Sequence, residues 1–355
     1  AAVYKVSGGR LMAVRLAQAA LGVVTVALIG ILAMLLFGRA AGLAALAIAA
    51  IYPGFLLMDD AIMSETLYVP LTLGAVVAAC MHRRSPHRWR WAVVAGLIFG
   101  LSLLTRQNGV LLLVPLILLV WSKPGADRRQ RLATAALVVL VAGLVVLPWT
   151  VRNAVKLDAF VPVATQSGLV LAGTYNDQSR NDPDLPGAWR PPNAVPRYAD
   201  VFRDKSLNEA GVDAELRSRA LSYISDHPGY LVAVGWHNVW RLMHLGGSRY
   251  ERDQAGDRNV TQGEETVGRF GFYVLALMAI AGAATGLARR APWYLWLVPV
   301  LLATVLLGQG MIRYRDPIDP FLVLLAACGV ASLAVRGHAT SGAAPAPPAA
   351  SGRAP

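Results

Sequence analysis

Long apolar runs separated by short basic loops constrain the fold of this chain more than any other feature. About nine runs, some of them short, approach the length that a helix needs to cross the roughly 30 Å hydrocarbon core of a bilayer. They cover residues 14–37, 41–58, 62–81, 91–105, 109–121, 132–149, 268–288, 292–310 and 319–335. A mean hydropathy of +0.48 and a charged fraction of 15% also fit a multi-spanning membrane protein better than a soluble enzyme. The sequence therefore predicts an all-α polytopic membrane protein with about nine transmembrane helices.

The net charge of +12 lies on one side of this predicted bundle. Alternate loops and the C-terminal tail hold thirteen Lys and Arg residues and one acid, Asp127, which gives 13 − 1 = +12. Residues 150–267 hold thirteen basic and fifteen acidic residues, which gives 13 − 15 = −2. Basic loops stay in the cytoplasm, so the long segment is predicted to be extracytoplasmic. This distribution leaves nucleic-acid binding without support.

Four regions follow from this topology. We expect an N-terminal transmembrane region of about six helices (1–149), an extracytoplasmic loop domain (150–267), a C-terminal transmembrane region of about three helices (268–335) and a disordered, Pro- and Ala-rich cytoplasmic tail (336–355). Within the loop domain we expect helices from Val212 to Ser225 and from Pro228 onwards. Residues 160–171 form either a strand pair or a surface segment. The chain begins at Ala1 without a leader, so we expect a truncated or processed N-terminus.

The segment RYRDPIDP, residues 313–320, places a dense cluster of charges between two apolar runs. Charges at a membrane boundary are expensive unless water, a partner or an anionic ligand receives them. Arg313 and Arg315 are therefore candidates for binding a lipid-linked phosphate, with Tyr314 as a hydrogen-bonding group. The prolines stiffen the turn that carries them. A solvated loop between helices remains the alternative.

Other candidates lie at the same predicted outer boundary. Glu65 opens an apolar run just after Asp60 in DDAIMSETLYVPL, and either carboxylate could orient or deprotonate an acceptor hydroxyl. Arg106 occupies a very short polar break in LLTRQNG, and Arg152 follows the sixth run in LPWTVRN. Both guanidinium groups suit a phosphate. The alternatives are a helix boundary in water for Glu65 and snorkelling to the interface for Arg106.

No cofactor or metal centre is indicated by the sequence. Cys80 and Cys328 lie inside apolar runs, the six histidines are scattered, and no phosphate-binding glycine loop occurs. We therefore expect no cofactor that the sequence can name. A divalent metal held by carboxylates remains an alternative.

Five motifs in order give the chain a resemblance to a known family: YPGFLLMDDAIMSETLY, GLSLLTRQNGVLLLVPL, VLPWTVRN, FVPVATQSGLVLAGTYND and RYRDPIDPFLVLLAA. The chain resembles bacterial GT-C glycosyltransferases of the family 39 branch, which are similar to protein O-mannosyltransferases. The resemblance implies a plasma-membrane enzyme that transfers a sugar from a polyprenyl-phosphate carrier to a glycan, lipid or protein of the envelope, on the outer face. It also implies that the main catalytic Asp belongs to a first outer loop N-terminal to this sequence, after a missing first helix. Glu65 and the pair Arg313 and Arg315 match the branch's second acidic position and its carrier-phosphate region.

Two other classes of function remain open on the sequence. A transporter or flippase for lipid-linked sugars would place its charges near the bilayer midplane and in repeated halves, whereas here they lie at the outer ends of the runs. A non-catalytic protein of envelope assembly is the other alternative. The sequence leaves open the sugar, the acceptor and the oligomeric state.

Overall fold

The computed structural model is helical, as the sequence predicts. It describes residues 2–60, 62–85, 89–247, 250, 252 and 260–341, and no strand occurs among them. The stretch at 160–171 forms no strand pair, because its second half begins helix α9. Helix α16 continues to Ser341, past the predicted start of the tail at 336. The rest of the tail, 342–355, lies outside the described residues.

The N-terminal part contains a series of helices between Ala2 and Leu157. They are α1 (Ala2–Val6), α2 (Leu11–Phe37), α3 (Arg39–Ile51), α4 (Pro53–Asp60), α5 (Glu65–Arg84), α6 (Arg90–Thr105), the 3₁₀ helix η1 (Gln107–Leu112), α7 (Leu113–Trp121) and α8 (Arg128–Leu157). The predicted run 41–58 is divided at Tyr52, which is extended because Pro53 follows it. Gly38, with φ +99°, makes the reversal between α2 and α3, a conformation that a side chain would strain.

The rest of the chain forms a second set of helices. Between the two groups of membrane helices lie α9 (Ser167–Thr174), α10 (Asp177–Arg180), η2 (Pro192–Ala194), α11 (Glu209–Asp226) and α12 (Pro228–Leu242). The C-terminal group is α14 (Gln262–Ala283), η3 (Ala288–Arg290), η4 (Trp293–Trp296), α15 (Leu297–Leu302), η5 (Ala303–Leu307), η6 (Ile312–Arg315) and α16 (Asp319–Ser341). Helices α11 and α12 occur where the sequence predicts them.

Four helices are long and apolar enough to cross a membrane: α2, α5, α8 and α14. Shorter apolar helical segments occupy the other five predicted runs, at Arg39–Ile51, Arg90–Thr105, Gln107–Trp121, Trp293–Leu307 and Asp319–Ala334. Over the described residues the protein is therefore all-helical with four candidate membrane spans, and nine spans remain a proposal. The run at 292–310 is not one regular helix, because 3₁₀ turns precede and follow α15.

Small residues allow the apolar helices to approach closely. Helix α14 packs along α16 at Gly282, where a β-carbon would clash with the carbonyl oxygen of Leu325. Helix α6 packs on α8 at Gly96 and Gly100 in the same way. Lipid tails are as apolar as the helix surfaces, so the hydrophobic effect does not drive helices together within a membrane. Close packing at small residues does so instead. Substitution of these glycines by larger residues would force the helix pairs apart.

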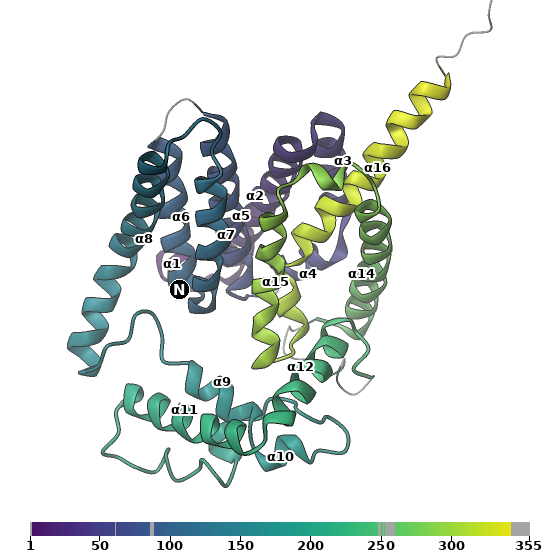
Figure 1. The fold of residues 1–355 in the computed structure, drawn as a ribbon. Helices are drawn as coiled ribbons and strands as arrows, with labels where there is room; N and C mark the ends of the chain where they lie inside the picture. Colours follow the sequence, from purple (N-terminus) through teal and green to yellow (C-terminus); the bar gives the residue numbers. More distant parts are fainter. Residues whose placement is uncertain are drawn as a thin grey trace, which may run out of the picture.

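Helices α9 to α11 lie together at one end of the bundle, and α12 leads from them back to it (Figure 1). We call residues 158–247 the end segment. It has its own apolar cores, one around Tyr198 and Leu216 and another around Tyr175, Tyr223 and Tyr230. Buried Asp213 on α11 accepts a hydrogen bond of 2.7 Å from the backbone N–H of Gly168, which fixes α9 against α11.

The one-sided charge gives the membrane orientation a direct test. Ser206 is exposed in the end segment, whereas Ser85 ends α5 at the basic side. We expect an impermeant thiol reagent to label Ser206→Cys in intact cells, in a background without Cys80 and Cys328, and to label Ser85→Cys only after lysis. The reverse pattern would invert the orientation.

Candidate functional site

Glu65 is the buried centre of a polar cluster at the start of α5. Glu65 is 1% exposed, and it is the first of the 20 residues of α5, which ends at the basic side of the bundle. The carboxylate accepts a hydrogen bond of 3.1 Å at Oε2 from Ser64. Its Oε1 faces two guanidinium groups that come from distant parts of the chain. A buried carboxylate of this kind requires such partners.

Arg106 supplies the first guanidinium. Helix α6 ends at Thr105, and Arg106 itself is extended before η1 begins, so the short polar break predicted from the sequence exists. Its Nη1 lies 2.5 Å from Glu65 Oε1. The guanidinium also lies 4.7 Å from the ring centroid of Tyr314 and 5.9 Å from that of Tyr68. Arg106 is therefore held in one place by a carboxylate and two aromatic rings.

Arg313 supplies the second guanidinium, from η6. Its Nε lies 3.7 Å from Glu65 Oε1, and its Nη1 lies 3.7 Å from Met63 Sδ. The side chain is 30% exposed, against 15% for Arg106, so it presents more of its surface to solvent or a ligand. Tyr314 donates a 2.5 Å hydrogen bond to Gln309 and lies between the two arginines, its ring centroid 5.3 Å from the Arg313 guanidinium. The structure thus brings Glu65, Arg106, Arg313 and Tyr314 together.

Arg315 occupies a different environment, although it belongs to the same RYR motif. It is 3% exposed, with Nε 3.1 Å from Asp319 Oδ1 and Nη1 donating to the carbonyl of Leu242 at 3.0 Å. Tyr52 donates to the same Asp319 carboxylate at 2.6 Å. The guanidinium stacks 3.7 Å from the ring centroid of Phe272. These contacts tie α16 to α12, α14 and the start of α4, so protein groups already occupy the Arg315 donors.

Backbone carbonyls just before η6 are held by the end segment. Asn238 donates to the carbonyl of Leu306 at 2.6 Å, and Tyr175 donates to that of Leu307 at 2.5 Å. The carbonyl of Gly308 accepts from Thr174 of the end segment, and that of Gly310 accepts from Tyr250, which follows the segment. Irregular backbone at a helix end needs such partners, because its carbonyls lack intrahelical ones. The end segment therefore fixes the path of the chain that places Arg313 and Tyr314.

Of the two remaining sequence candidates, Arg152 does not join this cluster in the described structure, and the Asp60 side chain is not among the described residues. Arg152 is exposed on α8, where its guanidinium stacks 4.7 Å from the Trp149 ring and donates to Asn153 at 3.0 Å. In the described part of the chain, its contacts are with these neighbours on its own helix. Asp60 is the last residue of α4, and its side chain lies outside the described residues.

Sequence reasoning missed the groups that support the cluster. Tyr68 lies one helical turn after Glu65, so it shares a helix face with it, and that spacing could have identified it. Gln18 and Thr66 form a buried hydrogen bond of 3.2 Å between α2 and α5, and Thr66 donates on to the Met58 carbonyl. Outside the cluster, nothing in the sequence pointed to Tyr52 beside the Arg315–Asp319 pair, because 267 positions separate Tyr52 from Asp319.

No group of three or more His, Cys, Asp or Glu side chains that could hold a metal ion occurs in the described residues. The cluster itself contains one described carboxylate and two arginines. Its chemistry therefore suits an anion better than a cation.

Comparison with known families gives a match over the N-terminal part of the chain. Residues 1–151 match the sequence profile of a family described as dolichyl-phosphate-mannose-protein mannosyltransferase. The matched part includes Glu65 and Arg106, whereas Arg313 and Tyr314 lie beyond it. Neither the curated proteins nor the solved structures gave a significant match. The match covers less than half of the chain, and together with the apolar helices it supports a GT-C mannosyltransferase-like membrane protein.

Proposed function

We propose that this protein transfers a sugar from a polyprenyl-phosphate-linked donor to a cell-envelope acceptor, on the membrane face where Glu65 lies. The family match supports a membrane glycosyltransferase of the GT-C type. The donor, the acceptor and the outward orientation are part of the proposal.

The observation that carries the proposal is the convergence of Arg106 and Arg313 on the buried carboxylate of Glu65. These residues lie 41 and 248 positions away from Glu65 in the chain, yet their guanidinium groups reach the same oxygen, Oε1. Two arginines and one glutamate leave a local charge of 2 − 1 = +1. A sugar linked to a lipid by one phosphodiester carries a charge of about −1, which such a site can receive by charge-assisted hydrogen bonds.

The arrangement suggests a role for each side chain. Arg313, the more exposed arginine, meets the donor phosphate and stabilises the negative charge that grows on it as the sugar leaves. Arg106, held between Glu65 and Tyr314, supports that charge from a fixed position. Glu65 is too enclosed to reach solvent, so we assign it the positioning of both arginines rather than direct contact with the acceptor. The sequence had suggested a different role for Glu65, in which its carboxylate orients or deprotonates the acceptor hydroxyl.

The reaction is a displacement at the anomeric carbon. The acceptor hydroxyl oxygen forms a bond to that carbon, the bond from the carbon to the phosphate oxygen breaks, and the hydroxyl proton passes to a base. The leaving lipid phosphate keeps the electron pair of the broken bond. No nucleotide is consumed, because the sugar is already activated on its lipid.

Donor choice in isolated membranes tests the proposed function. Membranes from cells that express the protein from its native gene are given radiolabelled sugar on polyprenyl phosphate, or the same sugar on a nucleotide. We expect transfer to envelope material from the lipid donor, with no dependence on added nucleotide sugar. Transfer from the nucleotide sugar alone, after lipid-linked sugar synthesis is blocked, would contradict the proposal.

A further inference from the structure

A cavity of about 690 Å³ lies at the opposite end of α5 from Glu65. The 20 residues of α5 span about 30 Å, which is close to the thickness of the bilayer core. The cavity is therefore separate from the proposed donor site. It falls within the size range of small-molecule sites, roughly 300–1,000 Å³.

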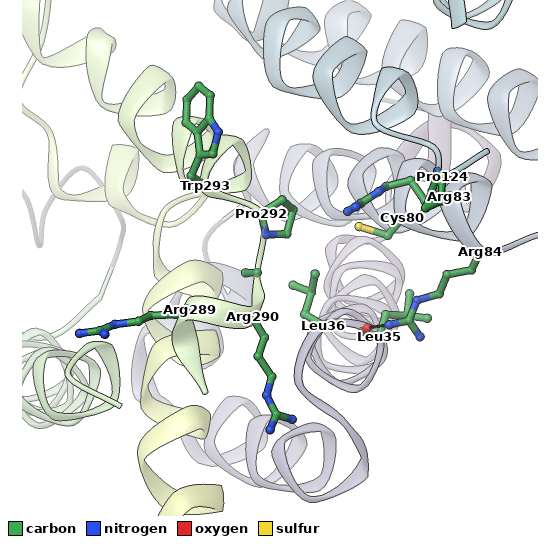
Figure 2. A pocket seen from close by; sticks show the side chains of 11 residues that line it. Leu35, Leu36, Cys80, Arg83, Arg84, Pro124, Arg289, Arg290, Pro292 and Trp293 are labelled. Carbon is green, nitrogen blue, oxygen red and sulfur yellow. Dashed lines mark hydrogen bonds between the residues drawn. The ribbon is translucent and has the colours of Figure 1, made fainter. Parts of the chain in front are cut away.

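Two halves of the protein meet at this cavity. The ends of α2 and α5 and the turn at Pro124 line it from the N-terminal half, and the segment between α14 and η4 lines it from the C-terminal half (Figure 2). Its lining includes four arginines and no acidic residue among the described residues: Arg83, Arg84, Arg289 and Arg290. Leu35, Leu36 and Cys80 supply apolar surface.

Arg83 is the arginine that faces the cavity most directly. Figure 2 shows its side chain, beside Cys80, pointing toward Pro292 on the other half, whereas Arg289 points away. The Nε of Arg83 is buried, and no acceptor for it occurs in the described part of the chain. Arg84 instead donates to the backbone carbonyl of Leu35. A buried donor of a charged group is costly without an acceptor, so the cavity favours an anion.

The surroundings indicate a lipid. Trp293 at the rim is 69% exposed, and tryptophan is typical of the membrane interface. Basic pockets between membrane helices on the cytoplasmic side receive anionic head groups. We propose that this cavity binds the negatively charged phosphate head group of a membrane lipid, with Arg83 and Arg290 as its main ligands and the acyl chains leaving past Trp293.

Lipid titration of the purified protein in detergent tests the proposed lipid site. Binding is measured by native mass spectrometry and by the rise in melting temperature, with phosphatidylglycerol, polyprenyl phosphate, phosphatidylcholine and inorganic phosphate as separate ligands. We expect Arg83→Gln to weaken binding of the anionic lipids roughly ten- to a hundredfold, because a charge-assisted contact is lost. Arg290→Gln should weaken it by about two- to tenfold, since that side chain is exposed.

Arg129→Gln is the matched control, because Arg129 is an exposed arginine on the basic side that does not line the cavity. The affinity of this variant for the anionic lipids should stay within about twofold of that of the wild type. If Arg83→Gln does not fold, the lipid affinity of Arg290→Gln tests the proposal instead, because that side chain is exposed. Preference for polyprenyl phosphate over phosphatidylglycerol would support the proposal and identify the carrier lipid. Equal binding of phosphatidylcholine, inorganic phosphate as effective as the lipids, or equal losses in Arg129→Gln and Arg290→Gln would overturn it.

Discussion

Glu65→Gln is expected to lower kcat/KM for sugar transfer by about a hundredfold, which corresponds to about 2.7 kcal/mol. The amide keeps the shape of the side chain but loses the negative charge that holds Arg106 at 2.5 Å and Arg313 at 3.7 Å. Two like charges then face each other without their common partner, so the guanidinium groups separate and the donor phosphate loses a preformed site. Initial rates of labelled-sugar transfer, measured against donor concentration in membranes, give the effect.

The pH–rate profile separates positioning by Glu65 from a role as the base. If Glu65 positions the arginines, Glu65→Gln lowers the rate at every pH and the profile keeps its shape. If Glu65 is the base, the acid limb of the profile disappears. Glu215→Gln is a suitable control, because Glu215 also pairs with an arginine, Arg219, at 2.7 Å but in an exposed pair on α11. Transfer by Glu215→Gln should match the wild type, and equal losses in the two variants would contradict the assignment.

Arg315→Ala is expected to lower the free energy of unfolding by about 3–5 kcal/mol. The substitution leaves the Asp319 carboxylate, 1% exposed, without its arginine and removes the donor to the Leu242 carbonyl. An uncompensated buried charge is what makes the loss of one partner so costly. Unfolding in mixed micelles with a denaturing detergent measures the change.

A double-mutant cycle separates the Arg315–Asp319 pair from its surroundings. Arg315→Met combined with Asp319→Leu removes both charges, and we expect it to be more stable than either single variant. Arg219→Ala, which breaks exposed pairs with Glu215 and Asp200, should cost no more than about 1 kcal/mol. Additive effects of Arg315→Met and Asp319→Leu would show that the pair does not hold α16 in place.

The sequence predicts much of this fold, because membrane helices are encoded in local composition. Each of the nine apolar runs coincides with a helical segment, and Pro228 begins α12 as expected. The break at Tyr52 was missed, although Pro53 signals it. The 3₁₀ turn after α15 was missed for another reason, since Asn238 and Tyr175 hold the carbonyls at its end from far along the chain.

The candidate site could be predicted only in part. Charges at helix ends identified Glu65, Arg106 and Arg313, and the structure places them in contact. The same reasoning grouped Arg315 with Arg313 and added Arg152. Neighbouring residues on a 3₁₀ turn point in different directions, so Arg315 turns into the core toward Asp319 while Arg313 stays near Glu65. Whether a boundary arginine stacks on its own helix, as Arg152 does, depends on contacts that composition does not encode.

The proposed phosphate site is tested most directly by comparing how the transfer rates of Arg313→Ala and Arg152→Ala depend on donor concentration. Both variants remove an arginine from the same predicted side of the membrane, but only Arg313 reaches the Glu65 cluster. We predict that Arg313→Ala lowers kcat/KM for the polyprenyl-phosphate donor roughly ten- to a hundredfold, the equivalent of one charge-assisted contact, while Arg152→Ala stays within about threefold of the wild type. Transfer at the wild-type rate by Arg313→Ala, or an equal loss in Arg152→Ala, would contradict a donor site built on Glu65, Arg106 and Arg313.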